Sequence, residues 1–262
     1  MQQLDGHGAA PAIAPARGRR SGATARNRTA GLHARQRGSA GLAPYGAWRG
    51  RMQWAIGLLL LLALLPVLAQ PAPAANADPS SRTVLVMGDS LSAAYGLRAD
   101  EGWVALVAER MAGSHPEWRV VNASISGETS AGGSARIVGE VLRHRPDVVV
   151  IALGANDALR GLPLSALKYN LARMIGASRH VGARVLLVGM RMPPNLGPEY
   201  TRGFERTYRE LAGFFGIELL PFLLEPVAAD RANFMDDNLH PTAGAQPAIG
   251  EHIWQALEPM LR

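Results

Sequence analysis

The sequence predicts an α/β domain of three layers, in which a doubly wound, five-stranded parallel sheet lies between two layers of helices. Short apolar runs alternate five times with longer segments of helical pattern between residues 83 and 257. The apolar runs are nearly continuous in Val, Ile and Leu, which indicates strands that are covered on both faces. No internal repeat and no second folded domain is apparent in the sequence.

The elements follow one another in a regular order. The predicted strands are TVLVM (83–87), RVVNA (119–123), DVVVIAL (147–153), ARVLLVGM (183–190) and IELLP (217–221). The predicted helices span residues 103–111, 135–144, 163–178, 199–215 and 243–257. The stretch VLVMGDSLSAAYG (84–96) also predicts that the first strand passes through a tight turn into a helical segment.

The basic charge of the chain belongs to its N-terminal part. Residues 1–51 carry nine Arg and one Asp, a net charge of +8, whereas residues 78–262 carry 18 Lys and Arg against 20 Asp and Glu, a net charge of −2. The first segment is rich in Gly, Ala, Arg and Pro without apolar periodicity, so we expect it to be disordered. The charge of the folded part does not indicate a nucleic-acid partner.

Residues 52–77, MQWAIGLLLLLALLPVLAQPAPAANA, have the pattern of a signal peptide. Their apolar run of 16 residues (54–69) contains Pro66 and is short for a membrane span. Ala75-Asn76-Ala77 supplies a cleavage site, so we expect a mature domain of residues 78–262 in the periplasm or medium, without a stable membrane anchor. Two alternatives stay open: an uncleaved anchor, and a translation start at Met52 that leaves residues 1–51 out of the protein.

The sequence contains no cysteine. This excludes thiol nucleophiles, thiolate metal sites, disulfides and a lipid-modified cysteine after the signal. A mature chain of this length can bury a sizeable core without such links. We expect a monomer that uses neither a metal nor an organic cofactor.

Polar loops that contain glycine follow the predicted strands. Gly88-Asp89-Ser90 follows the first strand, SISGET (124–129) the second and GAND (154–157) the third, while DDNLHP (236–241) precedes the last helix. Ligands of doubly wound folds bind outside the carboxyl ends of the strands. We therefore expect the chemistry of this protein in these loops.

Three of these loop residues have the types required for nucleophilic catalysis. Ser90 lies where its Oγ projects from the edge of the sheet, and a serine nucleophile needs a base and a group that orients the base. Among the seven histidines, His240 alone lies in such a loop beside acidic residues. Asp237 precedes it by three residues, so that a single turn of chain can direct the carboxylate at Nδ1 and leave Nε2 free for the serine proton.

Donors for an oxyanion are expected from the same loops. They are the N–H of Ser90, the N–H of Gly127 and the side-chain amide of Asn156. Glycine suits position 127 because the backbone has to approach the substrate closely there and can adopt a positive φ.

Each of these features also has a simpler interpretation. Ser90 or Asp89 could cap the first helix, residues 154–157 could form an ordinary turn, and Asp236 and Asp237 could cap the last helix. The chain lacks the G-x-S-x-G turn of the usual α/β hydrolases.

The combination of motifs resembles the SGNH (GDSL) hydrolases. GDSL (88–91), the glycine of NASISGETS (122–130), GAND (154–157) and DNLHP (237–241) are similar to the four blocks of that family and stand in the same order. LRGLP (159–163), RMPPNLGPEY (191–200) and PFLLEPV (221–227) resemble its subgroup of periplasmic multifunctional esterases, which act as thioesterases and lysophospholipases, and the related arylesterases. The resemblance runs from about Thr83 to the C-terminus and implies a flavodoxin-like fold.

The resemblance implies roles for particular residues. Ser90 corresponds to the nucleophile, Asp237 and His240 to the other members of the triad, and Gly127 and Asn156 to oxyanion donors. Two positions depart from the close relatives: Glu128 stands in place of Asp, and Ala155 in place of a common Gly. Both departures bear on the edge of the pocket and on the preferred acyl group. We interpret Asp89 as structural, bonded to N–H groups of the nearby loop.

The function expected from the residues and the resemblance is that of a serine esterase, which hydrolyses carboxylic esters and thioesters (aryl esters, acyl-CoA and lysophospholipids) through an acyl-enzyme. A carbohydrate O-deacetylase of the same fold and a non-catalytic acyl-binding protein are the alternatives. Met192, Pro193 and Leu196 belong to the irregular segment after the fourth strand and are expected to line a groove for the acyl chain. The alternative for that segment is a solvent-exposed loop.

Overall fold

The computed structural model describes residues 81–262. The predictions for the Arg-rich segment and the signal peptide therefore lie outside the described residues. None of the helices in residues 81–262 combines the length and the hydropathy that a membrane span requires.

Five parallel strands form one sheet. They are β1 (Arg82–Gly88), β2 (Trp118–Asn122), β3 (Val148–Ala152), β4 (Arg184–Val188) and β5 (Glu218–Leu220), in the spatial order β2-β1-β3-β4-β5. The chain passes from β1 to β2 on one side and then returns to place β3 on the other side of β1. The carboxyl ends of β1 and β3 thus form the topological switch point, where doubly wound folds bind ligands.

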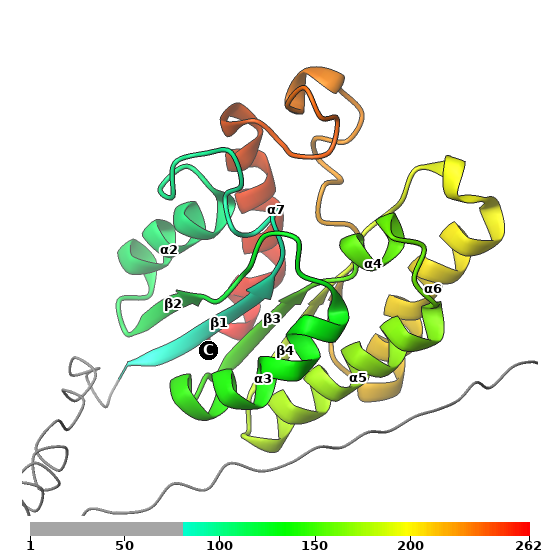
Figure 1. The fold of residues 1–262 in the computed structure, drawn as a ribbon. Coiled ribbons are helices and arrows are strands. Elements are labelled where there is room, and N and C mark those ends of the chain that lie inside the picture. Colours follow the sequence, from blue (N-terminus) through cyan, green and yellow to red (C-terminus); the bar gives the residue numbers. More distant parts are fainter. Residues whose placement is uncertain (1–80) are drawn as a thin grey trace, which may run out of the picture. The chain divides into compact units, whose positions relative to one another are not determined.

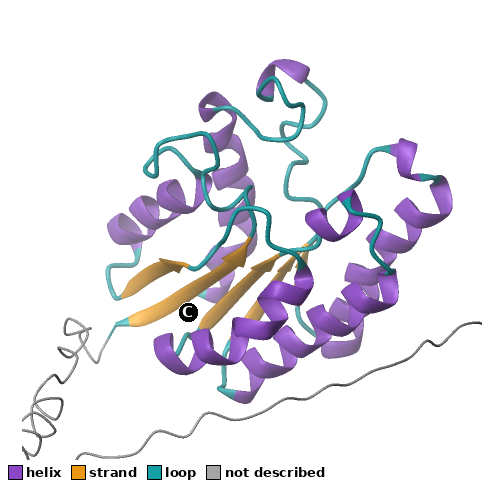
Figure 2. Ribbon diagram, viewed as in Figure 1, coloured by secondary structure: helices purple, strands orange, loops and turns teal. Residues whose placement is uncertain are grey.

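Helices cover both faces of this sheet (Figures 1 and 2). One face packs against α2 (Trp103–Ser114) and α7 (Gln246–Leu257). The other face packs against α3 (Ser130–His144), α5 (Leu164–His180) and α6 (Pro198–Phe215). This arrangement confirms the predicted three-layer fold.

The strands are buried because their side chains alternate between the two cores. In β1, Val84 and Val86 enter the core under α2 and α7, whereas Leu85 and Met87 enter the core under α3, α5 and α6. All four are at most 2% exposed. The continuous apolar runs of the sequence are explained by this double burial.

The prediction of a helical segment directly after Ser90 is wrong. The N–H groups of Ser92 and Ala93 both donate to the carbonyl of Asp89, which makes one turn, but the chain then continues through further turns until α2 begins at Trp103. Ala94 and Gly96 have φ values of 55° and 73° and break the helical path. Ser90 therefore does not cap a helix.

Other elements differ from expectation in smaller ways. Helix α3 begins five residues before the predicted start, through Gly132 and Gly133, which are poor helix formers. A Cβ on Gly133 would lie 2.3 Å from Cδ1 of Leu153, so close packing of α3 against the residue that follows β3 requires glycine at this position. The polar segment after β3, expected to be a loop with an ordinary turn as the simpler alternative, forms the short helix α4 (Ala155–Leu159). Single 3₁₀ turns occur at η2 (Pro194–Leu196), η3 (Arg231–Asn233), η4 (Ala243–Ala245) and η5 (Glu258–Met260).

Candidate active site

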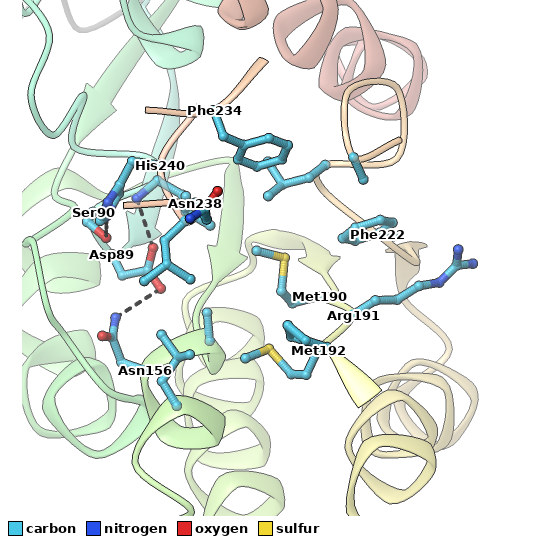
Figure 3. Close-up of a pocket in the computed structure, with 17 residues that line it drawn as sticks. Asp89, Ser90, Asn156, Met190, Arg191, Met192, Phe222, Phe234, Asn238 and His240 are labelled. Carbon is cyan, nitrogen blue, oxygen red and sulfur yellow. Dashed lines mark hydrogen bonds between the residues drawn. The ribbon is translucent and has the colours of Figure 1, made fainter. Parts of the chain in front are cut away.

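Ser90 and His240 meet at the carboxyl end of the sheet. Ser90 lies two residues beyond the end of the buried strand β1, and its Oγ is 2.9 Å from Nε2 of His240 (Figure 3). The two residues are 150 positions apart in the chain, so only the fold brings them together.

Asp237 completes a chain of polar contacts through His240. Its Oδ2 lies 2.6 Å from Nδ1 of His240, and its Oδ1 accepts the backbone N–H groups of Leu239 at 2.9 Å and His240 at 3.0 Å. These contacts, first the backbone N–H of His240 and then its ring, lower the pKa of Asp237 to about 2. The carboxylate is therefore ionised and fixed in orientation at neutral pH.

The loop that carries His240 is a tight turn. Asn238 adopts a left-handed conformation with φ of 58°, and the N–H of Met235 donates to the carbonyl of His240 at 2.8 Å. Phe234 and Pro241 form an antiparallel bridge across the base of this turn. Asp237 and His240 are thereby presented on the same side, as their spacing in the sequence predicts.

Asp89 occupies a different environment from Asp237, although both neighbour the same imidazole. It is buried, accepts the N–H of Leu91 at 3.0 Å and accepts Nδ2 of Asn156 at 3.3 Å. Burial raises its pKa to about 6, against the opposing effects of its hydrogen bond to Leu91 and the charge of His240. The bond to Leu91 agrees with the expected structural role of Asp89.

Asn156 lies next to Asp89, and the loop of Gly127 lies next to Asn156. Asn156 is in the first turn of α4, and its Nδ2 donates to the carbonyl of Glu128 at 3.1 Å as well as to Asp89. Gly127 has a φ of 77°, a backbone conformation that favours glycine. Its carbonyl accepts a hydrogen bond from Nη2 of Arg160 at 3.0 Å.

A partly buried ion pair fixes the loop of Gly127. Arg136 of α3 donates to both carboxylate oxygens of Glu128, at 2.7 Å and 2.5 Å, and its Nη2 also reaches the carbonyl of Ala123. The side chain of Glu128 is 7% exposed. The Glu at this position is therefore part of a clamp between α3 and the loop, a contact that the sequence did not reveal.

A cavity of about 410 Å³ extends from Ser90 and His240. Its walls are mainly apolar, and in Figure 3 the side chains of Met190, Met192, Phe222 and Phe234 surround the space opposite Ser90. Asp89 and Asn156 form the polar end of the cavity beside Ser90.

The structure differs from the expectation for the acyl groove. Met192 and Pro193 line the cavity, but Leu196 does not: it is the last residue of the 3₁₀ turn η2 and packs against the core under α3, α5 and α6. The 3₁₀ turn begins directly after Pro193 and separates Leu196 from the residues that line the cavity. Sequence reasoning missed Met190, Phe222 and Phe234, because apolar residues at the ends of strands and in loops have no pattern that distinguishes a cavity wall from a core.

Comparison with known proteins supports the same assignment of family. The model of the GDSL-like Lipase/Acylhydrolase family matches residues 86–246, which include Ser90, Asn156, Asp237 and His240. This chain belongs to that family.

Relatives of this GDSL hydrolase cover nearly the whole of its folded part. It is 46% identical over 182 residues to Esterase TesA of Pseudomonas aeruginosa (70% of this chain, 90% of the relative). It is 40% identical over 181 residues to an arylesterase of Vibrio mimicus (69% and 90%). A further relative, thioesterase 1/protease 1/lysophospholipase L1 of Escherichia coli K12, is 37% identical over 179 residues (68% and 85%).

The fold of this GDSL hydrolase is also that of a solved relative. A crystal structure of TesA superposes with a TM-score of 0.66 at 46% identity and covers 68% of this chain and 99% of its own. Together with the relatives above, this identifies the chain as a serine esterase of the family.

Proposed function

We propose that Ser90 is the nucleophile of this esterase, His240 its general base and Asp237 the group that orients the base. The observation that carries the proposal is the unbroken line of contacts from Ser90 Oγ through His240 Nε2 and Nδ1 to Asp237 Oδ2, with distances of 2.9 Å and 2.6 Å. A nucleophile, a base and an orienting carboxylate within hydrogen-bond reach are the requirements of this chemistry.

In the first half of the reaction, Ser90 Oγ attacks the carbonyl carbon of the ester and its proton passes to Nε2 of His240. The tetrahedral intermediate collapses, the bond to the alcohol, phenol or thiol breaks, and the leaving group takes the proton from Nε2. In the second half, water attacks the acyl-enzyme and gives its proton to Nε2. The second tetrahedral intermediate releases the carboxylic acid, and Ser90 recovers its proton.

The oxyanion is stabilised in this proposal by the N–H groups of Ser90 and Gly127 and by Nδ2 of Asn156. In the resting site Nδ2 already faces two acceptors, Glu128 at 3.1 Å and Asp89 at 3.3 Å. The longer contact is the weaker one, so the oxyanion would displace Asp89 and keep the bond to Glu128. Asp89 then holds the amide in place only until the negative charge forms on the substrate.

We propose carboxylic esters and thioesters as substrates, with aryl esters, acyl-CoA and lysophospholipids as the classes to test. An apolar cavity of about 410 Å³ beside Ser90 suits an acyl chain better than a carbohydrate, which favours this class over the O-deacetylase alternative. The relatives named as an arylesterase and as a thioesterase and lysophospholipase support the same choice.

The test is the Ser90→Ala variant, assayed with p-nitrophenyl acetate for the burst of p-nitrophenol that accompanies acylation. We expect the burst and steady turnover to disappear while the thermal midpoint stays close to that of the wild type. Ser165→Ala, at an exposed position on α5, is the matched control and should keep full activity. Turnover that survives in Ser90→Ala would contradict the assignment of the nucleophile.

We further propose that the esterase acts as a monomer after export to the periplasm or medium. The signal-peptide pattern of residues 52–77 supports export. Light scattering of the purified domain tests this proposal, and we expect the molar mass of a single chain.

A further inference from the structure

The aromatic ring of Tyr95, which has no part in the proposed triad or oxyanion hole, lies against the imidazole of His240. The ring centroids of Tyr95 and His240 are 4.4 Å apart, with the planes inclined by 36°. The rings are tilted towards each other, and their centroid distance is slightly shorter than the usual range of about 4.5–7 Å for ring pairs. We propose that Tyr95 is a positioning residue, which fixes the plane of the His240 ring for proton transfer; the proposal rests on the catalytic role of His240 argued above.

The hydrogen bonds of His240 leave one motion of its ring unrestrained. Asp237 contacts Nδ1 and Ser90 contacts Nε2, and both contacts lie at the edge of the ring. These two contacts still permit the ring to rotate about the line that joins Nδ1 and Nε2. Such a rotation moves the hydrogen-bonding groups out of alignment and weakens both hydrogen bonds, because their strength depends on the donor–hydrogen–acceptor angle. A contact on the ring face opposes this rotation, and Tyr95 provides it.

The backbone holds Tyr95 in this place. Its N–H donates to the carbonyl of Ser90 at 3.2 Å, and Ala94, the preceding residue, adopts the left-handed conformation. The left-handed conformation is unfavourable for alanine, because its Cβ crowds the following carbonyl oxygen. The backbone of Gly102 packs closely against this turn, since a Cβ on Gly102 would lie only 2.7 Å from the Cβ of Ala94.

The turn of Tyr95 also contacts the turn of His240 at a second point. A Cβ placed on Gly96 would lie 3.1 Å from Sδ of Met235, so the two turns pass close to each other. The segment after the nucleophile and the segment before the base therefore lie side by side at this point as well. The aromatic contact of Tyr95 and His240 is thus one of two places at which these turns approach each other.

The ring face of Tyr95, and not its hydroxyl, is the part that acts on His240. Among the described residues the hydroxyl has no hydrogen-bond partner, and Tyr95 is 50% exposed, whereas the side chain of His240 is only 17% exposed. An aromatic face also attracts a cation within about 6 Å of its centroid. When His240 carries the serine proton it becomes such a cation, so the contact strengthens towards the transition state and should appear in kcat.

The experiment compares Tyr95→Leu with Tyr95→Phe in the full domain, using p-nitrophenyl acetate. We expect Tyr95→Leu to lower kcat about tenfold with KM within about twofold of the wild type, because the face contact and its attraction for the imidazolium are lost. Tyr95→Phe keeps the ring and should restore kcat to within about twofold. Tyr169→Leu, at a more exposed tyrosine on α5, is the matched control and should change neither constant.

The outcomes separate this inference from the proposed triad. A wild-type kcat for a folded Tyr95→Leu, together with an inactive Ser90→Ala, would overturn the role of Tyr95 and leave the triad intact. A change in KM alone would make Tyr95 a substrate contact and would also overturn it. An equal loss in Tyr95→Phe would assign the effect to the hydroxyl instead of the ring face. An active Ser90→Ala would overturn the triad and, with it, this inference.

Discussion

Two carboxyl groups beside one imidazole have opposite electrostatic environments. Asp237 is 38% exposed and accepts two backbone N–H groups and the imidazole, whereas Asp89 is 2% exposed and accepts one backbone N–H. Hydrogen bonds stabilise the anion of Asp237, and the absence of water destabilises the anion of Asp89. The pKa values of about 2 and about 6 follow from this difference.

The carboxylate of Asp237 should be essential, and that of its neighbour Asp236 should not. Asp237→Asn removes the charge that stabilises the imidazolium and presents the wrong hydrogen-bond partner to Nδ1, so we expect kcat to fall by about 10⁴. Asp236→Asn is the matched control, because only the backbone carbonyl of Asp236 makes a described contact, with Asn238. An active Asp237→Asn beside an inactive Asp236→Asn would reverse the assignment.

Asp89 should make the stability of the protein depend on pH. Its pKa is about 6 in the folded state and has the ordinary value of 3.8 when the chain is unfolded, so between these pH values the folded state binds more protons than the unfolded state. The free energy of unfolding therefore decreases as pH rises from about 4 to about 6, by about 3 kcal/mol for this group.

Urea unfolding of the wild type and Asp89→Asn at about pH 4 and about pH 7.5 measures this effect. We expect the wild type to lose about 3 kcal/mol relative to the variant between the two pH values. Asp237→Asn is the comparison: the pKa of Asp237 is about 2, so most of its contribution is present above about pH 4 and is lost only at lower pH. Parallel pH dependence of the wild type and Asp89→Asn would contradict the burial effect.

At the scale of the elements, loops after three strands and the segment before α7 together form the site. In the proposed site, the loop after β1 supplies Ser90, the loop after β2 supplies Gly127, and α4 after β3 supplies Asn156. Side-chain contacts connect these segments: Asn156 to Asp89 and Glu128, and Arg136 to Glu128. The strands and helices place these loops at one edge of the sheet, and the side-chain contacts between the loops determine the geometry of the site.

The segment after β4 should set the preference for acyl-chain length. Met192 lines the cavity, so Met192→Ala enlarges the apolar space and should shift the optimum of kcat/KM towards longer p-nitrophenyl esters. Leu196→Ala, in the same segment but facing the core, should leave the profile unchanged and lower the thermal midpoint. A series of p-nitrophenyl esters from acetate to palmitate provides the measurement. A profile altered by Leu196→Ala but not by Met192→Ala would contradict this division of the segment.

At the scale of the whole molecule, the order of the strands explains the location of the site. The chain leaves β1 and β3 in opposite directions, so the loops after these strands separate and leave a space at the switch point. Ser90 follows β1, and Asn156 follows β3, on the two sides of this space.

Export is the prediction that concerns the complete chain. Expression of the full sequence in a Gram-negative host, followed by N-terminal sequencing of the exported protein, should give a chain that begins near Asp78. The physical reason is the short apolar run with Pro66, which suits cleavage after Ala77 better than membrane retention. A product that keeps Met52 and remains in the membrane after a carbonate wash would contradict it.

The sequence alone determined the fold class and the order of its elements. Continuous apolar runs such as DVVVIAL predict buried parallel strands because both of their faces must be covered, and the observed β3 lies within one residue of that run at each end. The spacing of Asp237 and His240 also predicts their contact, since three residues of chain limit how far apart the two groups can lie.

The tertiary structure decided what depends on contacts between distant segments. The sequence favoured a helix after Ser90 and a groove lined by Leu196, but the left-handed Ala94 and the turn η2 direct the chain otherwise. Tyr95 meets His240 across 145 positions of chain. A local pattern contains no information about such a pairing, because it arises only when the sheet brings two turns to the same edge and packing selects their conformations.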